Sequence, residues 1–391
     1  MNVRSLRVLS LQPWYGGSHR QFADSWAQHS QHQWTTVGLP ARNWKWRMRY
    51  AAIELSRIVS QRLKDGEAWD VVVCTDMMNA AEFQSLTKGL QGVPIVVYFH
   101  ENQFAYPIRG KQQPDHHFLF TNLVSALAAD EVWFNSTFNL QSMLRGAAQH
   151  AEVWPDFDCD QEIKAISDKS KTVPPPVDLS DVDSAASVEN LQKRVADGQP
   201  LHLVWAARWE YDKDPDSLLQ CLELLSQQRV PFRLSVIGEQ ADAIPLAFNA
   251  IRTKFELSIE NWGYQESRKD YWAVLESADV FLSTAQHEFF GLSAVEAMSI
   301  GCWPLLPDRL AYPEVIEATK DQQRRDLFLY QSNAKDLAAK IRKLHLNRDW
   351  DFVALTELAN SLRRKLDFQK CAHSMDQMLI DLTLRCARTG G

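Results

Sequence analysis

Short apolar runs alternate with segments of helical periodicity along most of the chain. Many of the runs are continuous stretches of Val, Ile, Leu and Phe, which is typical of parallel strands buried on both faces. We predict strands at residues 6–11, 34–39, 69–74, 94–100, 131–135, 201–207, 232–238, 257–262, 278–284, 302–306 and 327–330. The helical segments between them predict an α/β fold of doubly wound, Rossmann-like domains.

Prolines mark the break between two such domains. The run Pro174-Pro175-Pro176 cannot continue a helix or a central strand, so it predicts a stiff hinge. With 391 residues, the chain is long enough for two separate cores. We predict an N-terminal domain at 1–178, a C-terminal domain at 179–365 and a final helical segment at 366–391, with a polar loop and a short helix at 181–198.

Composition narrows the class of protein. The net charge of −7 argues against a uniformly basic nucleic-acid binder, although it permits a local basic patch. The six cysteines have no C-x-x-C spacing, which indicates reduced thiols of a cytoplasmic protein and neither a disulfide framework nor a zinc site. No signal peptide is visible and no apolar stretch approaches the ~20 residues of a spanning helix, so we expect no stable membrane insertion. The sequence does not indicate an oligomeric state.

The familiar nucleotide motifs do not occur. Without Gly-x-Gly-x-x-Gly a dinucleotide-dependent dehydrogenase is disfavoured, and without Gly-x4-Gly-Lys-Ser/Thr a P-loop kinase is disfavoured.

The most informative stretch is 287–298, His-Glu-Phe-Phe-Gly-Leu-Ser-Ala-Val-Glu-Ala-Met. It follows a predicted strand, so Glu288 lies in a strand-to-helix loop and Glu296 just over one turn inside the helix. A helix N-terminus offers unpaired N–H groups and partial positive charge, and it binds phosphate. Two carboxylates beside such a site suit a nucleotide sugar, and solvated helix-end charges are the alternative. We assign donor binding to Phe290, Gly291, Leu292 and Glu296.

Polar segments also follow two predicted strands of the first domain. Ligands of open α/β sheets bind beyond the carboxyl ends of the strands. The first strand leads into Gly16-Gly17-Ser18-His19, where the glycines admit a phosphate or sugar or simply form a tight turn. The strand at 94–100 ends in His100-Glu101-Asn102-Gln103, whose many polar groups need partners. His100 would hold a sugar hydroxyl near the reacting carbon and Glu101 would orient it or bind the acceptor, unless the histidine is structural.

A cationic segment follows the first strand of the second domain. Arg208 and Lys213 would clamp a diphosphate and stabilise the charge of a departing nucleoside diphosphate. The alternative is a surface ion-pair network with the neighbouring Glu210, Asp212 and Asp214. The Asp-x-Asp pairs at 156–158 and 181–183 resemble a transferase metal motif, but they lie in irregular polar segments. We interpret them as solvated loop charges and expect no catalytic metal.

Basic and aromatic side chains interleave near residue 45. This segment contains Arg42, Trp44, Lys45, Trp46, Arg47, Arg49 and Tyr50. Such a mixture can pair RNA phosphates and stack unpaired bases. An amphipathic helix with its tryptophans in the core is an equally good interpretation. As a further alternative, Arg47 and Arg49 would touch the donor or the other domain.

Several motifs together indicate a family. The 287–298 block resembles the Glu-x7-Glu signature of retaining glycosyltransferases with the GT-B fold. Segments 15–19, 39–47, 98–103 and 208–215 are similar to the glycosyltransferase-like family that includes tRNA-queuosine α-mannosyltransferase. Ala207 and Asp214 depart from the glycines that related transferases usually have.

The resemblance implies roles for these segments. Glu288 would face the donor sugar and Glu296 would bind the ribose, with Gly16, Gly17, Ser18 and His19 facing the cleft. Donor binding falls on Gly16, Gly17, Arg208 and Lys213, and acceptor binding on Ser18, His19, Arg47, Glu101, Asn102 and Gln103. The last helix would cross back onto the first domain. GDP-mannose is the implied donor, and queuosine in tRNA-Asp the implied acceptor.

The predicted mechanism is retaining transfer without metal. Closure about 174–176 would bring the cations onto the diphosphate, the leaving phosphate would act as base, and His100 and Glu288 would position the sugar. Two other hypotheses remain open: a GT-B enzyme acting on a lipid or polysaccharide with another nucleotide sugar, and a non-catalytic RNA-binding protein.

Overall fold

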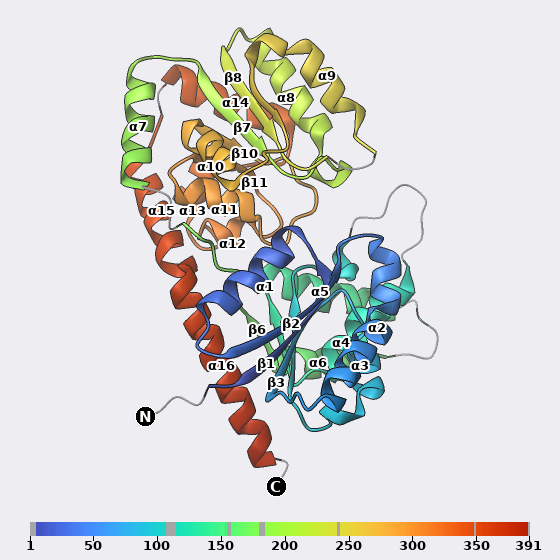
Figure 1. Ribbon diagram of the computed structural model, residues 1–391. Coiled ribbons are helices and arrows are strands. Elements are labelled where there is room, and N and C mark those ends of the chain that lie inside the picture. Colours follow the sequence, from blue (N-terminus) through green and yellow to red (C-terminus); the bar gives the residue numbers. More distant parts are fainter. Residues whose placement is uncertain are drawn as a thin grey trace. The chain divides into compact units, whose positions relative to one another are not determined.

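Two six-stranded parallel sheets form the framework of the protein, whose structure is a computed structural model (Figure 1). It describes residues 5–106, 115–152, 154, 158–179, 184–240, 243–347 and 349–389. The chain divides into two compact units: unit 1 comprises residues 1–176 and 368–391, and unit 2 comprises 177–367. The boundaries expected from the sequence were 178 and 365.

The sheet of unit 1 has the order β2-β1-β3-β4-β5-β6. Its strands are β1 (Arg7–Tyr15), β2 (Gln33–Pro40), β3 (Val71–Thr75), β4 (Ile95–Phe99), β5 (Glu131–Phe134) and β6 (Ser170–Thr172). Its helices are α1 (Gly17–His29), α2 (Trp44–Lys64), α3 (Ala80–Leu86), α4 (His116–Ala128), α5 (Thr137–Ala151), α6 (Asp160–Asp168) and α16 (Phe368–Thr389), with short 3-10 turns η1 (Lys88–Leu90) and η2 (Gln103–Ala105). The order reverses between β1 and β3.

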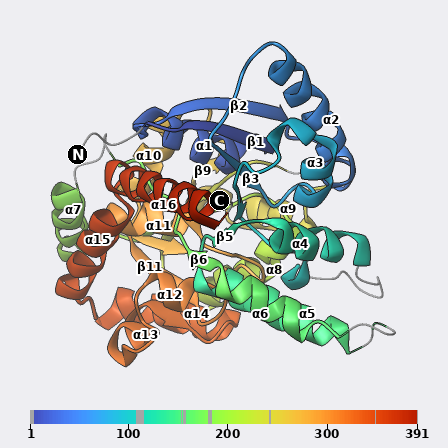
Figure 2. The ribbon, with the colours of Figure 1, turned by 90° about the horizontal axis from the view of Figure 1, so that it is seen from below.

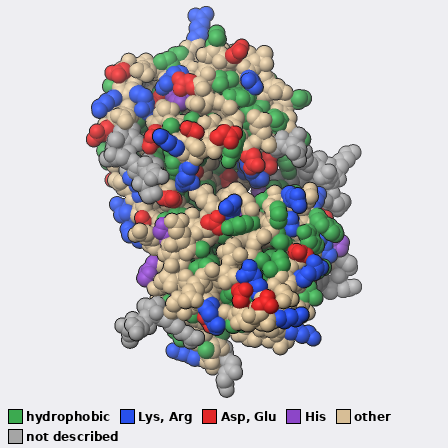
Figure 3. Space-filling model, in the orientation of Figure 1, with side chains coloured by type: hydrophobic (Ala, Val, Ile, Leu, Met, Phe, Trp, Pro, Cys, Tyr) green, Lys and Arg blue, Asp and Glu red, His purple; other side chains and the backbone are tan. Residues whose placement is uncertain are grey.

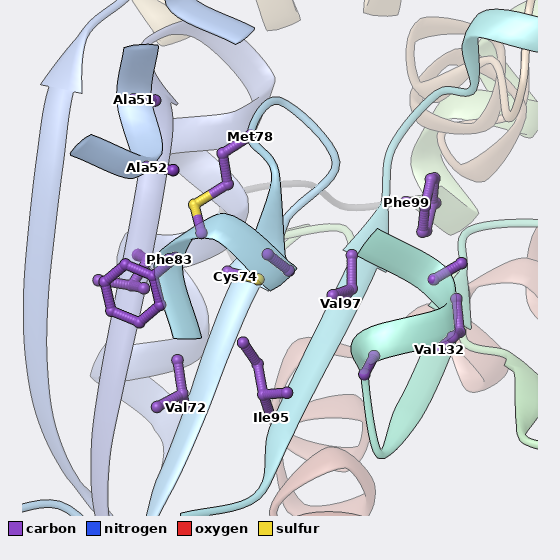
Figure 4. Packing of buried hydrophobic residues seen from close by; sticks show 14 of the residues in the cluster. Ala51, Ala52, Val72, Cys74, Met78, Phe83, Ile95, Val97, Phe99 and Val132 are labelled. Carbon is purple, nitrogen blue, oxygen red and sulfur yellow. The ribbon is translucent and has the colours of Figure 1, made fainter. Parts of the chain in front are cut away.

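Both faces of this sheet are buried. Alternate residues of a strand point to opposite faces, so Val72 and Cys74 join a core with α2 to α6, whereas Val71 and Val73 join a core with α1 and α16. Figure 4 shows part of the first core, with Phe83 of α3 and Val97 of β4. The continuous apolar runs are therefore explained by parallel strands with helices packed on both faces of the sheet.

Helix α16 completes unit 1 although it comes last in the chain (Figure 2). Its apolar side chains Ala372, Met375, Leu379 and Leu382 belong to the second core. The carboxylate of Asp376, which is fully buried, accepts hydrogen bonds from Trp26 Nε1 (3.0 Å), Ser30 Oγ (2.8 Å) and the Gln31 amide (2.8 Å). These contacts tie α16 to the end of α1.

The sheet of unit 2 has the order β12-β11-β10-β7-β8-β9. Its strands are β7 (Leu201–Ala206), β8 (Phe232–Ile237), β9 (Ile259–Gly263), β10 (Val280–Leu282), β11 (Trp303–Pro307) and β12 (Leu329–Tyr330). Its helices are α7 (Ser184–Ala196), α8 (Pro215–Gln227), α9 (Leu246–Lys254), α10 (Arg268–Ser277), α11 (Leu292–Ser299), α12 (Tyr312–Val315), α13 (Gln322–Phe328), α14 (Ala334–Asn347) and α15 (Phe352–Leu366), with turns η3 (Tyr211–Lys213) and η4 (Glu256–Ser258). Here the order reverses between β7 and β10.

Two elements differ from the sequence expectation. Strand β6 was missed because Ser-Lys-Thr carries no apolar run, and it pairs only with β5 at the sheet edge. Helix α7 is 13 residues long where a loop with a short helix was expected. Its residues Leu191 and Val195 are buried, and that tertiary packing stabilises a helix in a polar segment. Among the described residues, no helix has the length and apolarity to cross a membrane.

Candidate active site

A pocket opens in unit 2 where the strand order reverses. In open α/β sheets this switch point is the usual place for a ligand, because the flanking loops diverge to opposite faces. The pocket is lined by Ala206 at the end of β7 and the following Ala207, and from the segment after β10 by Ser283, Ala285 and Glu288. Lys213, Ser293 and Tyr312 complete its polar lining.

Lys213 links the two loops that flank this pocket. Its Nζ donates to the His287 carbonyl oxygen (2.7 Å) and lies 3.2 Å from Asp212 and 3.4 Å from Glu288. Burial alone would lower the pKa of Lys213, but the charges of Glu288 and Asp212 outweigh it and the pKa is raised. The pocket therefore contains a fixed cation.

Glu288 supplies the carboxylate of the pocket. Burial would raise the pKa of Glu288, but the positive charge of Lys213 outweighs that effect and the pKa lies below its usual value. The amide of Phe289 also donates to its Oε1 (3.2 Å). Because 27% of the Glu288 side-chain surface is exposed, this ionised group is accessible to a ligand.

The N-terminus of α11 forms one wall. Gly291 precedes the helix in the left-handed region (φ 83°), no side chain caps the helix, and its first turn carries no acidic residue. An added Cβ on Gly291 would come within 2.9 Å of the Tyr312 ring, so the close approach also requires glycine. The Ser293 hydroxyl donates to the Ala206 carbonyl (2.8 Å) and fixes the helix against β7. The first-turn N–H groups are thus left for an anion.

Glu296 and Arg208 lie apart from the pocket lining. Glu296 accepts a hydrogen bond from the Tyr271 hydroxyl (2.7 Å) and lies 3.7 Å from Arg268. Burial raises the pKa of Glu296, opposed by those two groups. Arg208 is 52% exposed and pairs with Glu210 (3.1 Å), as the ion-pair alternative anticipated. Its charge nevertheless lowers the pKa of His287.

Several supporting residues of this site were not found from the sequence. The Thr284 hydroxyl donates to the backbone carbonyl of Lys213 (2.7 Å), and the backbone N–H of Gln286 donates to the backbone carbonyl of Asp212 (2.7 Å). Burial, followed by the Lys213 charge, lowers the pKa of His287 to about 4, so this imidazole is neutral. Thr284 and Gln286 have no sequence signal beyond their proximity to the 287–298 stretch, and His287 begins that stretch but was assigned no role.

In unit 1 the predicted residues gather at the carboxyl edge of the sheet. The rings of His19 and His100 lie 4.1 Å apart, joining the loop after β1 to the end of β4. The His100 amide donates to Asp76 (2.9 Å), a buried residue directly after β3 that the sequence analysis missed. Burial, with His19, lowers the pKa of His100 well below its usual value, so the ring is neutral. Burial, with Glu101, raises the pKa of Asp76.

The predicted acceptor residues differ in their surroundings. Asn102 is fully buried; its amide donates to Asn139 (2.8 Å) and Ser142 (2.9 Å) while its oxygen caps η2, so its contacts are structural. The backbone of Gln103 is held by Asn122 (2.8 Å). Glu101 is partly exposed.

The remaining predicted residues lie after β1, at the start of α1, and in α2. Gly16 packs so closely that an added Cβ would lie 2.5 Å from that of Ala41, and Gly17 begins α1 with φ 52°. Ser18 is exposed. Arg47 is 5% exposed and donates to the Pro40 carbonyl (3.0 Å) and the Tyr50 hydroxyl (2.8 Å), so its guanidinium serves its own domain.

In the described part of the chain, no group of three or more His, Cys, Asp or Glu side chains is arranged to hold a metal ion. Of the Asp-x-Asp pairs, residues 156, 157 and 181–183 lie outside the described residues.

Comparison with known proteins gives the family. A family model described as the N-terminal part of tRNA-queuosine alpha-mannosyltransferase matches residues 7–177, and a model of glycosyl transferases group 1 matches 188–364. The tRNA-queuosine alpha-mannosyltransferase of Drosophila melanogaster is 33% identical over 322 residues, covering 81% of this chain and 83% of the fly protein. The chain belongs to this family. It is therefore a glycosyltransferase, which confirms the resemblance found in the motifs.

More distant similarities include another mannosyltransferase and solved structures with the same fold. A GDP-mannose:cellobiosyl-diphosphopolyprenol alpha-mannosyltransferase of Xanthomonas campestris is 26% identical, covering 70% of this chain and 64% of that protein. Among solved structures, Anabaena HepE in complex with UDP and glucose has a TM-score of 0.66 at 13% identity, covering 96% of this chain and 99% of that one. A Thermosynechococcus elongatus sucrose-phosphate synthase has a TM-score of 0.69 at 13% identity, covering 98% and 100%. The α/β GT-B fold is thereby confirmed.

Proposed function

We propose that this glycosyltransferase moves mannose from GDP-mannose onto a hydroxyl of queuosine in tRNA-Asp. The observation that carries the proposal is the match of residues 7–177, nearly all of the first part of unit 1, to the N-terminal model of the queuosine enzymes. The acceptor assignment rests on that half, because the group 1 model of residues 188–364 is common to transferases with other acceptors.

The donor diphosphate would bind in the pocket of unit 2. Lys213 and the first-turn amides of α11 supply fixed positive charge, which stabilises the nucleoside diphosphate as the sugar–phosphate bond breaks. In this proposal the protein's own groups stabilise the negative charge of the departing diphosphate, and no metal ion is needed. Glu288 would face the sugar and stabilise positive charge at its ring.

Retention follows if the acceptor hydroxyl attacks from the face that the phosphate leaves. The leaving phosphate then takes the acceptor proton, and no protein nucleophile is required. Nε2 of His100 would accept a hydrogen bond from a hydroxyl of the acceptor, because this buried nitrogen has no hydrogen-bond partner among the described residues. Its lowered pKa keeps the ring neutral and able to accept.

The decisive experiment is transfer from GDP-mannose to queuosine-containing tRNA, read as the mass of the modified nucleoside. We expect Glu288→Gln to lower kcat by about 10²–10³-fold, because one preorganised charge at the reacting centre is lost. Glu266→Gln, on an exposed glutamate of the same unit, is the matched control and should retain activity. Full activity of the Glu288 variant, or wild-type transfer from UDP-sugars alone, would contradict the proposal.

A lipid acceptor is the second candidate. It is favoured by the Xanthomonas relative, whose name specifies a diphosphopolyprenol acceptor, and by a GDP-mannose-dependent phosphatidylinositol dimannoside mannosyltransferase of Mycobacterium tuberculosis that is 30% identical over 147 residues. Transfer to polyprenol-linked sugar, with none to tRNA, would support it.

A further inference from the structure

We propose that the exposed face at the start of α2 is the docking surface for unpaired nucleotides of the tRNA acceptor. We call this face the α2 platform; it comprises Arg42, Lys45, Trp46, Arg49 and Tyr50. The inference rests on the proposed function, because it assumes an RNA acceptor, and it goes beyond it by naming the surface that recognises the RNA.

The platform presents an aromatic stack to solvent. Trp46 is 65% exposed, although a large apolar side chain is costly to leave in water. Its ring stacks on that of Tyr50, with centroids 5.4 Å apart and planes 29° from parallel. By contrast, Trp44 turns inward and packs on Phe118 (5.3 Å). The interpretation in which the tryptophans of this helix pack in the core therefore fits Trp44 but does not explain why Trp46 is exposed.

The stack is held in place from beneath. The buried Arg47 donates to the Tyr50 hydroxyl (2.8 Å), and its guanidinium lies 5.2 Å from the centre of that ring. Its other terminal nitrogen donates to the Pro40 carbonyl (3.0 Å), which anchors the arrangement to β2. A preorganised ring loses little conformational entropy when a base stacks on it. Arg47 is thus a positioning residue for the platform.

Basic residues adjoin the stack along the chain, and the Lys45 ammonium lies 5.5 Å from the centre of the neighbouring Trp44 ring. Arg42, Lys45 and Arg49 are exposed and lie in no ion pair with a described residue. No Asp or Glu occurs between Asp24 and Glu54, although the chain has a net charge of −7. Figure 3 shows basic and hydrophobic side chains interspersed on the surface over α2. Cations that flank an exposed aromatic pair match the phosphates and bases of single-stranded RNA.

The platform is continuous with the predicted acceptor residues of the same unit. Gly16 packs against Ala41, directly before the platform. Met48 of α2 packs in one small cluster with Met77, which follows Asp76, and with Trp14 of β1. The α2 platform and the His19–His100 pair therefore lie at the same carboxyl edge of the sheet.

A membrane is the competing partner for a basic helix. A helix that inserts into lipid shows a broad apolar face opposite its charges. On α2, only Trp46 and Ile53 are large apolar side chains with more than a third of their surface exposed. This narrow apolar content favours RNA.

The test compares two acceptors of different size. We expect Trp46→Ala to raise the Kd for queuosine-containing tRNA about tenfold or more, since base stacking on an aromatic ring contributes strongly to binding. Lys45→Ala with Arg49→Ala should weaken tRNA binding and reduce the slope of log Kd against log salt by roughly 1.4, at about 0.7 per phosphate contact. Transfer to the free queuosine nucleoside and binding of GDP should be unchanged in both variants.

The matched control removes two exposed cations elsewhere in unit 1. Lys64→Ala with Lys88→Ala should leave tRNA binding and its salt slope as in the wild type. An equal effect of this control, an unchanged Kd for the Trp46 variant, or a Trp46-dependent loss of binding to phosphatidylglycerol vesicles with tRNA binding intact would overturn the proposal. Failure of the proposed function differs from all of these, because wild-type protein would then transfer mannose to neither tRNA nor nucleoside.

Discussion

At the scale of residues, Lys213 is the centre of the candidate active site. It touches the loop after β10 through the His287 carbonyl and compensates the charges of Asp212 and Glu288. A carboxylate withdrawn from water without a cation is strongly unfavourable, so the lysine keeps Glu288 ionised. The same side chain is the cation that we propose for the donor diphosphate.

Replacing this lysine should therefore affect two measurements. We expect Lys213→Met to lower the affinity for GDP at least about tenfold, by calorimetry, and to lower the free energy of unfolding by about 2–4 kcal/mol, because the buried Asp212 and the partly buried Glu288 lose their cation. Lys269→Met removes an exposed lysine of the same unit and should change neither. Unchanged GDP affinity in the Lys213 variant would place the diphosphate elsewhere.

His287 should make unit 2 sensitive to acid. Its pKa is about 4 in the folded protein against 6.5 for an ordinary histidine. The unfolded chain takes up this proton first, so stability is complete above pH 6.5 and falls as the pH drops to about 4, by up to roughly 3 kcal/mol. Urea unfolding of His287→Asn at pH 7 and pH 4 should show a smaller loss than the wild type. Equal losses would mean that His287 does not titrate in this way.

At the scale of elements, the junction between Gly291 and α11 shapes the candidate anion site. The left-handed backbone at Gly291 directs the first-turn amides of the helix, and the nearby Tyr312 ring leaves no room for a Cβ. Helix and site therefore depend on a single residue without a side chain.

Gly291→Ala should move the start of α11. The backbone cost of a positive φ is about 1–2 kcal/mol, and the contact with Tyr312 adds to it. We expect GDP affinity to fall about tenfold or more, by thermal shift or calorimetry. Gly66→Ala has the same kind of backbone strain (φ 93°) with no atom within 4 Å of the new Cβ, so it should cost stability alone. Equal GDP affinity in the two variants would contradict this role.

At the scale of the whole molecule, the chain leaves unit 1 after residue 176 and returns to it at 368. The returning helix α16 supplies part of the second core and buries Asp376 against the end of α1. Unit 1 therefore folds from two segments far apart in sequence.

Asp376→Ala should destabilise unit 1 without touching the candidate site. It leaves the buried Trp26 indole and the Gln31 amide without an acceptor, which we expect to cost about 2–4 kcal/mol in denaturant unfolding. Asp381→Ala lies on the same helix but is exposed and contacts Gln377, so its effect should stay within about 0.5 kcal/mol. A similar small effect of both variants would mean that α16 contributes little to unit 1.

The sequence by itself determined the elements whose physics is local. Apolar runs, many of them continuous, identified the strands of both sheets apart from the polar edge strand β6, and the 287–298 block identified a glycine that starts a helix beside Glu288. The motifs also indicated the correct family. These features could be predicted from the sequence because an apolar strand and the start of a helix each depend on a few neighbouring residues.

Tertiary structure alone decided which side chains meet. It brought Lys213 to Glu288 across 75 positions, gave Arg208 a surface partner in Glu210, and directed Glu296 to Tyr271. It also separated Trp44, which is partly buried against a small cluster with Met48 and Phe118, from Trp46, which is exposed. No local pattern contains this information, because the order of strands in a sheet sets which loops are neighbours.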